Sequence, residues 1–258
     1  MVLPTEIGDA AQAADAARVK AWLDSGGDIN DGDKENYTLI HCCAIGTREN
    51  SEVTDGHVSL ARTLIALGAD VNICDSCGAS DTPLLQVLEN AWRGGSWPDM
   101  IGLLLQAKAN PNARNQYNET PLKHAIAIDQ KYELSNPPLD LQTSSSLKAL
   151  RMLLRAGASL DDEAAADGCK AAAEDIVKHY YGDSDNEAAV AIKALVAGVR
   201  QHGTYKRYMR APHREFLALR GLAQRGKLRT DHRVLDFLAM QGDNGIVWNI
   251  LSYWRATN

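Results

Sequence analysis

The sequence predicts an all-α fold, a solenoid of stacked helix pairs that is closed by further helices at its C-terminal end. Alanine and leucine dominate the composition, which favours helices. A six-residue phrase also recurs, as "SGGDIN" ending at Asn30, "LGADVN" at Asn72, "AKANPN" at Asn112 and "AGASLD" at Asp161. An apolar helical pattern precedes each copy, for example "LARTLIAL" and "LKALRMLLRA". A fixed phrase after each helical pattern indicates a repeat protein.

The bulk composition is that of a soluble globular protein. The 258 residues are 45% hydrophobic and 23% charged, and no window approaches eighteen uncharged apolar residues, so we expect no membrane span. The start, "MVLPTEIGDA", lacks the basic and apolar regions of a secretory signal. Five cysteines are too few, and odd in number, for a secreted disulfide framework. We therefore expect an intracellular protein, cytoplasmic or nuclear, with reduced thiols.

A second phrase marks the start of the first helix in each unit. It reads "TLIHCCA" from Thr38, "TPLLQVL" from Thr82 and "TPLKHAI" from Thr120. A threonine side chain at this position can cap the helix by accepting a backbone N–H group that has no partner within the helix. Pro83 and Pro121 follow at the first helical position, where the missing N–H costs nothing. These residues predict helices that begin at 83 and 121.

The ends of the second helices carry residues suited to a left-handed backbone. Three glycines are expected to end these helices in that conformation, namely Gly27, Gly68 and Gly157. Lys108 takes the glycine's place in the third unit, so we expect a strained or different helix end there.

Together the two phrases resemble the ankyrin repeat, whose pattern runs T-P-L-H-x-A-A, then G-H-x-E, then L-L-L-x-x-G-A-D-V-N. The best match is residues 56–72, "GHVSLARTLIALGADVN", and the resemblance covers residues 10–161. It implies helix-turn-helix units joined by hairpin-like turns, with a protein partner bound on a concave surface of hairpin tips and first helices. Asn36 and Asn118 stand where the pattern has glycine, and asparagine tolerates a positive φ.

The spacing of the motifs departs from the ankyrin pattern. A unit of about 33 residues places the threonine about 25 residues before the final asparagine. Here the spacings are 34, 30 and 41 residues, which predicts insertions of roughly 9, 5 and 16 residues between the two helices of the three units. The last insertion is polar and rich in proline and serine, so we expect a surface loop. The motif histidine remains only as His41, with Leu85 and Lys123 at the equivalent places, so the later units should lack the link that it makes between turns.

Cys74 and Cys77 form a C-x-x-C pair in the turn after the second unit, where the connection is two residues longer than its neighbours. A structural zinc site needs four ligands, and the remaining close pair, Cys42 and Cys43, stands at positions for small buried side chains. We interpret the C-x-x-C stretch as a hairpin tip, with a reversible disulfide as the alternative and a metal site as the least favoured. No metal and no cofactor is expected.

Three regions are predicted: ankyrin units over 1–161, a degenerate helical pair over 162–203, and a helical C-terminal extension over 204–258. The first unit should be a capping repeat that buries Val19, Trp22 and Leu23. The degenerate pair should break at "YYGDSDN" with Asp185 or Asn186 as the cap. Its apolar faces are predicted to contain Ile176, Val177, Tyr180, Val190, Ile192, Leu195, Val196 and Val199.

No catalytic pattern is present in the sequence. G-x-S-x-G, the phosphate-binding glycine loops and H-E-x-x-H are missing, and the seven histidines form no spacing that chemistry requires. We therefore expect a monomeric, non-enzymatic scaffold that binds another protein.

The candidate partner-binding residues lie at the turns. Tyr37 and Tyr117 are the expected anchors, since aromatic residues concentrate binding energy. Trp92 and Trp97 are either a second anchor pair or packing residues where the first helix turns back. The remaining candidates are Lys34, Glu35, Gly78, Ala79, Asp81, Gln116 and Glu119.

Two alternative functions involve the C-terminal part of the chain. Residues 204–258 could be a recruitment box, as in adaptors of ubiquitin ligases, while the repeats hold a client protein. Residues 201–233 contain nine Lys or Arg against Glu215 and Asp231, a net charge of +7 in a chain of −6, so they could bind a nucleic acid or an anionic membrane. A solvated helix face is the simpler interpretation, and we do not expect nucleic acid as a partner.

Overall fold

The computed structural model describes residues 2–132, 143–161, 172–182 and 184–211, with the single positions 214, 222 and 225. These residues form the helices α1 to α10, one short 3-10 helix and a further helical stretch over 205–211, and the part of the chain so described contains no strand. The predicted all-α class is thus confirmed. The chain divides into two compact units, Met1–Val196 and Ala197–Asn258.

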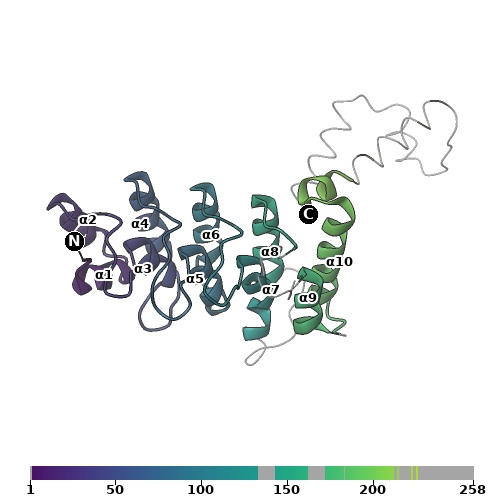
Figure 1. Ribbon diagram of the computed structural model, residues 1–258, viewed down its shortest axis with the longest axis horizontal. Helices are drawn as coiled ribbons and strands as arrows, with labels where there is room; N and C mark the ends of the chain where they lie inside the picture. The colour runs from purple at the N-terminus through teal and green to yellow at the C-terminus, as the bar shows by residue number, and fades with distance from the viewer. Residues whose placement is uncertain are drawn as a thin grey trace. The chain divides into compact units, whose positions relative to one another are not determined.

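Most of the helices come in pairs, and the first helices of the pairs form one layer while the second helices form another (Figure 1). The first helices α1, α3, α5 and α7 contact one another in sequence, and α4, α6 and α8 do the same. The bounds are α1 Thr5–Gln12, α2 Ala16–Asp24, α3 Leu39–Ile45, α4 Asp55–Ala66, α5 Pro83–Asn90, η1 Ala91–Arg93, α6 Trp97–Gln106, α7 Pro121–Tyr132, α8 Ser145–Ala156, α9 Ala173–Tyr181 and α10 Glu187–His202.

The first helices begin where the capping threonines predict. The Thr82 hydroxyl accepts the backbone N–H of Leu85, and the Thr120 hydroxyl accepts that of Lys123, each at 3.4 Å. α5 and α7 start at the prolines that follow these threonines. Thr38 caps α3 with help from His41, whose Nδ1 lies 3.2 Å from the Thr38 backbone nitrogen. The predicted starts of the first helices are confirmed.

The turns after the second helices differ from the prediction at one position. Gly68 and Gly157 have the expected positive φ, 101° and 99°, but in the first unit the left-handed residue is Gly26, at 98°, and not Gly27. The prediction for Gly27 was wrong by one residue, because Gly26 is the position four residues before the motif asparagine. Gly27 lies against the Trp22 indole, where an added Cβ would come within 2.4 Å of the ring.

Non-glycine residues occupy the other left-handed positions. Lys108 has a φ of 70°, which confirms the expected strain at the end of α6. Asn36 and Asn118 have φ values of 60° and 57°, as their place in the turns predicted.

Asparagine side chains join each unit to the next. Asn72 accepts the backbone N–H of Asn110 at 2.8 Å and donates from Nδ2 to the Lys108 carbonyl at 3.3 Å. Asn112 repeats both bonds, with the Ser159 N–H and the Gly157 carbonyl, at the same distances. These bonds fix the register of successive units, because they connect equivalent turns.

Two of the predicted insertions lie between the helices of their units, at 46–54 and 94–96, and they contact each other. The Ser96 N–H donates to the Val53 carbonyl at 2.6 Å, and an Arg93 nitrogen donates to the Asn50 carbonyl at 3.2 Å. Val53 is buried beneath them. The third predicted insertion lies largely in 133–142, outside the described residues.

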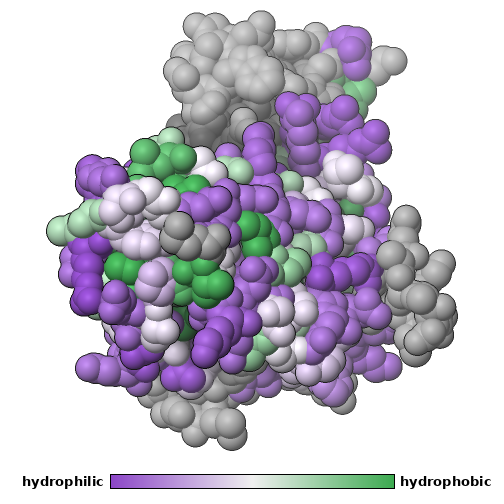
Figure 2. Space-filling model, turned by 60° about the vertical axis from the view of Figure 1, so that its left-hand side comes forward, coloured by the Kyte–Doolittle hydropathy of each residue, from purple (hydrophilic) through white to green (hydrophobic). Residues whose placement is uncertain are grey.

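The core is a continuous row of aliphatic side chains between the two layers. Cys42 and Cys43 are buried in it, as predicted for small apolar residues. Val19 of the first unit is buried, whereas Trp22 and Leu23 are only partly buried. Figure 2, which turns the N-terminal side forward, shows hydrophobic surface enclosed by hydrophilic side chains on this side of the molecule.

α9 and α10 form where two further helices were predicted. Asn186 caps α10 by accepting the Ala189 N–H at 2.6 Å. Of the predicted apolar face, Ile176 and Tyr180 are half-buried and Val190 is 50% exposed, because Val190 lies off the stripe of α10 that the other residues share. The buried members are Val177, Ile192, Leu195, Val196 and Val199.

Tyr181 was not among the predicted residues. It is buried, and its hydroxyl donates to the Ile126 carbonyl of α7 at 3.0 Å. This bond connects the fifth pair to the fourth. The sequence pattern of the helix did not indicate it, because the bond depends on how the two pairs stack.

The strain at Lys108 leads to a stability prediction. Lys108→Gly should raise the free energy of unfolding by about 0.5–1 kcal/mol, because the relief of a left-handed non-glycine conformation exceeds the added entropy of the unfolded chain. Equilibrium unfolding in urea measures this difference. Gly68→Ala is the matched control and should lower stability by about 1 kcal/mol, since nothing lies within 4 Å of the added Cβ and only the φ of 101° is strained. Equal stability of Lys108→Gly and the native chain would contradict the claim that the left-handed backbone at Lys108 is strained.

Candidate protein-binding surface

Three hairpin turns project between successive units, and each is organised by an Asp or Asn side chain at its start. Asp33 accepts the backbone N–H groups of Glu35 and Tyr37, at 2.9 and 3.0 Å. Asn115 makes the same two bonds with Tyr117 and Glu119, at 3.0 Å each. A short polar side chain that satisfies the backbone of the following residues stabilises such a turn. These two residues were not singled out in the sequence, although an Asp or Asn three residues before another Asn was a usable signal.

The middle hairpin contains the C-x-x-C pair. Asp75 accepts the Cys77 N–H at 3.0 Å, and its own N–H donates to the Asp81 carbonyl at 3.0 Å. The turn is therefore a longer version of its neighbours. Cys74 is exposed, Cys77 is partly exposed, and both are free thiols.

The environment of these thiols is acidic. Partial burial, together with the charges of Asp75 and Asp81, raises the pKa of the Cys74 thiol. A raised pKa lowers the fraction of thiolate, which is the form that attacks disulfides and binds metals. Among the described residues, no group of three or more His, Cys, Asp or Glu side chains is arranged to hold a metal ion.

The three hairpins are joined into one strip, called here the tip strip, which comprises residues 33–37, 75–81 and 115–119. The Ser76 N–H donates to the Glu35 carbonyl at 2.7 Å, and the Gln116 N–H donates to the Ala79 carbonyl at 2.8 Å. The Asn36 side chain adds a bond to the Cys74 carbonyl at 2.7 Å. Backbone bonds between hairpins hold the tips at a fixed spacing.

Several predicted binding residues are accessible on the tip strip. Tyr117 is 65% exposed at the tip of the third hairpin. Tyr37 is half-buried, with its ring edge-on to His41 at a centroid distance of 5.8 Å. Glu119 is also half-buried. The exposed members are Lys34, Glu35, Gly78, Gln116 and Tyr117, while Ala79 is partly exposed.

The other predicted residues are placed differently. Asp81 is buried, where its carboxylate accepts the Asn115 amide at 3.0 Å and so connects the second and third hairpins. Trp97 is 5% exposed at the start of α6, which favours the packing interpretation. Trp92 is partly exposed beside the Arg93 guanidinium, 4.3 Å from its ring centroid. Neither tryptophan belongs to the tip strip.

Two buried histidines connect turns to neighbouring units. His41 Nε2 lies 3.2 Å from the Asp81 carbonyl, and His57 Nε2 lies 2.8 Å from the Gln12 carbonyl. Burial lowers the pKa of His41 to about 4, so its ring is neutral at pH 7. Both rings are occupied in structural bonds. In the next unit Leu85 stands at the position of the motif histidine and makes no such link. There the hydrogen bond from the Asn115 amide to the Asp81 carboxylate connects the second and third hairpins.

Carboxylates gather along the tip strip and the adjoining first helices. Burial and the neighbouring Asp81 raise the pKa of Asp75 to about 6, and burial also raises the pKa of Asp81. Glu119 has a cationic partner, since Lys123 Nζ lies 2.6 Å from its carboxylate. His124 lies between two glutamates, with Nδ1 2.8 Å from Glu89 and Nε2 3.2 Å from Glu119.

The comparisons with known proteins agree with this geometry. A family model for the ankyrin repeat matches residues 35–76, which contain α3 and α4 and end at the start of the middle hairpin. The chain contains an ankyrin repeat. An ankyrin repeat protein of Acanthamoeba polyphaga mimivirus is 40% identical over 63 residues, which is 24% of this chain and 38% of that protein. The match thus spans well under half of the length of the viral relative.

Two general properties of ankyrin repeats bear on this chain. Ankyrin repeats generally mediate protein–protein interactions, and the family is typically non-enzymatic. No helix in the described ranges is long and apolar enough to cross a membrane.

The raised pKa of Asp75 leads to a pH-dependent prediction. A carboxyl group whose pKa is about 6 when folded and about 4 when unfolded stabilises the fold below pH 4, and that contribution is lost as the pH rises through 6. Asp75→Asn keeps the oxygen that accepts the Cys77 N–H but cannot ionise. Its advantage over the native chain should therefore grow from pH 4 to pH 7, reaching about 1–2 kcal/mol in the free energy of unfolding.

Urea unfolding at several pH values measures this advantage. Asp33→Asn, in the equivalent turn of the first hairpin, controls for the amide itself. His41 titrates in both proteins, so its effect cancels in the difference. An advantage of Asp75→Asn that stays constant between pH 4 and 7 would show that ionisation of Asp75 does not destabilise the fold.

Proposed function

We propose that this ankyrin repeat protein is a non-enzymatic scaffold that binds a protein partner through the tip strip and the adjoining first helices α3, α5 and α7. The observation that carries the proposal is the pair of backbone bonds, Ser76 to Glu35 and Gln116 to Ala79, that joins three hairpins into one continuous surface. A surface held by backbone bonds loses little entropy on binding, and such preorganisation favours affinity.

Aromatic residues supply the expected anchors on this surface. Tyr117, with 65% of its surface exposed, has no packing role that would require a large ring at the tip. Tyr37 is partly buried and held against His41, so it presents a fixed edge. Tyrosine is enriched among residues that dominate binding energy, because it buries a large area at low conformational cost.

The surface also has a charge preference. Burial and the charge of Asp81 raise the pKa of Asp75, and burial raises the pKa of Asp81. The charges of Glu35 on one side and of Glu89 and Glu119 on the other add to these shifts, so the carboxylates of the hairpins and first helices lie close together. Lys34 and Lys123 oppose them only in part. Charge complementarity to such a surface speeds association and selects partners, so we propose a partner with a basic contact region.

Two other proposals concern the C-terminal part. The adaptor function of residues 204–258 depends almost wholly on positions outside the described residues. Lys206, Arg207 and Arg210, within the basic window, are exposed. Binding of a polyanion through this window remains a separate proposal, and so does the division of the chain at residues 161 and 203.

Truncation of the exposed tyrosine tests the proposed surface. Tyr117→Ala should reduce capture of the specific partners from cell lysate at least tenfold, because an anchor residue typically contributes more than about 1.4 kcal/mol to binding. Quantitative mass spectrometry of proteins captured by the full chain measures the change. Leu67→Ala is the matched control, since Leu67 is 59% exposed at the end of α4 and lies off the tip strip.

Both substitutions remove an exposed side chain, so thermal unfolding of the two variants should match that of the native chain. If Tyr117→Ala captures the same proteins in the same amounts as Leu67→Ala, the partner binds elsewhere and the proposal fails.

A further inference from the structure

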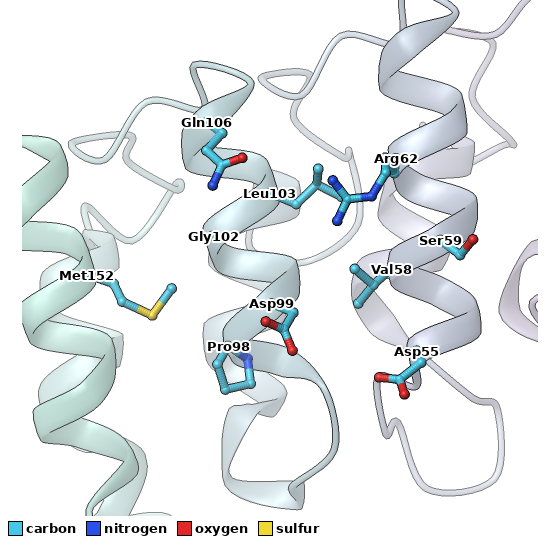
Figure 3. Close-up of a pocket in the computed structure, with 10 residues that line it drawn as sticks. All are labelled: Asp55, Val58, Ser59, Arg62, Pro98, Asp99, Gly102, Leu103, Gln106 and Met152. Atoms are coloured by element: carbon cyan, nitrogen blue, oxygen red, sulfur yellow. The ribbon is translucent and has the colours of Figure 1, made fainter.

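A groove lies on the layer of second helices, away from the tip strip (Figure 3). It has a volume of about 460 Å³ and runs from α4 across α6 at Gly102 to Met152 of α8. The partner surface proposed above uses the hairpins and the first helices, so this groove is a separate feature of the same stack.

The lining of the groove mixes polar and apolar residues, and apolar side chains occupy its middle. Val58 of α4 and Leu103 of α6 lie on its two sides, and the Met152 side chain points toward α6 from the third helix (Figure 3). Val58 and Leu103 are each 7% exposed, so they form a floor and not a protruding patch. An aliphatic side chain from another molecule could bury itself here with little rearrangement.

Gly102 keeps the groove open. A Cβ added at this position would meet the Met152 methyl at 3.6 Å, an ordinary contact, so packing does not require glycine there. Glycine within a helix is less favourable than alanine. The fold therefore carries a glycine at a position where a side chain would narrow the groove and stabilise the helix.

Charged groups are arranged along the groove by sign. Asp55 and Asp99 stand in the first turns of α4 and α6, and Asp55 accepts a hydrogen bond from the Ser96 hydroxyl. Arg62 lies two turns further along α4, about 10 Å away at 1.5 Å per residue, and its guanidinium extends toward Leu103 (Figure 3). In the described ranges no hydrogen bond or ion pair engages the side chain of Arg62 or of Asp99. The groove thus has a negative end, an apolar middle and a positive end.

We propose that this groove binds an amphipathic helix of a partner protein, aligned antiparallel to α4 and α6. The helix would present an acidic side chain to Arg62, leucine-like side chains three and four residues later to Val58, Gly102 and Leu103, and a basic side chain seven residues after the acidic one to Asp55 and Asp99. The seven-residue spacing covers the same two turns that separate Asp55 from Arg62. The antiparallel direction places the acidic residue in the first turn of the partner helix, where the dipole favours it. Docking of one apolar face into a groove is an established way for proteins to recognise helices.

The test uses a synthetic, side-chain-stapled helical peptide with Glu at its first contact position, Leu at the fourth and fifth, and Lys at the eighth. Its binding to the full-length chain is measured by fluorescence anisotropy. Gly102→Leu fills the groove and should weaken binding at least tenfold, whereas Gly102→Ala, the matched control, narrows it by a single methyl group and should weaken binding much less. Unfolding temperatures of both variants that equal or exceed that of the native chain show that the fold is intact.

The charge pairing is tested by exchange. Arg62→Glu should weaken binding of the Glu peptide about tenfold, and a peptide with Lys at that position should regain it. Tyr117→Ala should leave binding unchanged, which separates this site from the tip strip. Binding that is equal for Gly102→Leu and Gly102→Ala, or no binding at millimolar peptide, overturns the proposal. A native chain that sediments as a dimer while Gly102→Leu sediments as a monomer also overturns it, because the occupant would then be a second copy.

Discussion

Each helix pair of this protein buries its apolar side against the neighbouring pairs, and the register of that packing depends on the asparagine bonds between equivalent turns. Asn72 and Asn112 each accept a backbone N–H of the next unit. Each also donates to a carbonyl at the end of the second helix of that next unit. Apolar burial supplies the bulk of the stability but is not directional. The amide bonds are directional, so they determine which side chains of one layer meet those of the next.

The tip strip follows from that register. When the units are held at a fixed offset, the hairpins approach closely enough for Ser76 and Gln116 to bond to the hairpins before them. The same offset brings His41 to the Asp81 carbonyl and Asn115 to the Asp81 carboxylate. A rigid array of turns on one side and a groove between α4 and α6 on the other are therefore two results of a single stacking arrangement.

Much of the fold could be predicted from residue types whose conformational preference is strong. A threonine followed by a proline, as at Thr82 and Pro83, favours a helix start at the proline. Asn36 and Asn118 occupy left-handed turn positions because few other residues tolerate a positive φ. The error at Gly26 and Gly27 arose because two adjacent glycines satisfy the same local rule, and only the alignment with the motif asparagine separates them. Local preference decides a conformation, but it cannot decide between equivalent neighbours.

The surface was less predictable, because exposure depends on packing between units. Asp81 occupies a turn position that is usually solvated, yet the longer middle hairpin folds over it and Asn115 bonds to it. The groove could not be anticipated either, since Val58, Arg62, Gly102 and Met152 come from three helices that are distant in sequence. The two tyrosines show the same limit: each stands beside a left-handed asparagine of its turn, yet Tyr117 is exposed and Tyr37 packs half-buried against His41.

The coupling between units is tested most directly by hydrogen exchange of the full chain with Asn72→Ala, followed by mass spectrometry of peptides from α4, α6 and α1. The substitution removes two bonds across one junction, worth about 1–2 kcal/mol together. We predict that amide protection falls in both α4 and α6, on the two sides of the junction, and falls less in α1 because each unit contacts only its neighbours. A loss of protection confined to the Asn110 amide would contradict the claim that these bonds set the register of the stack.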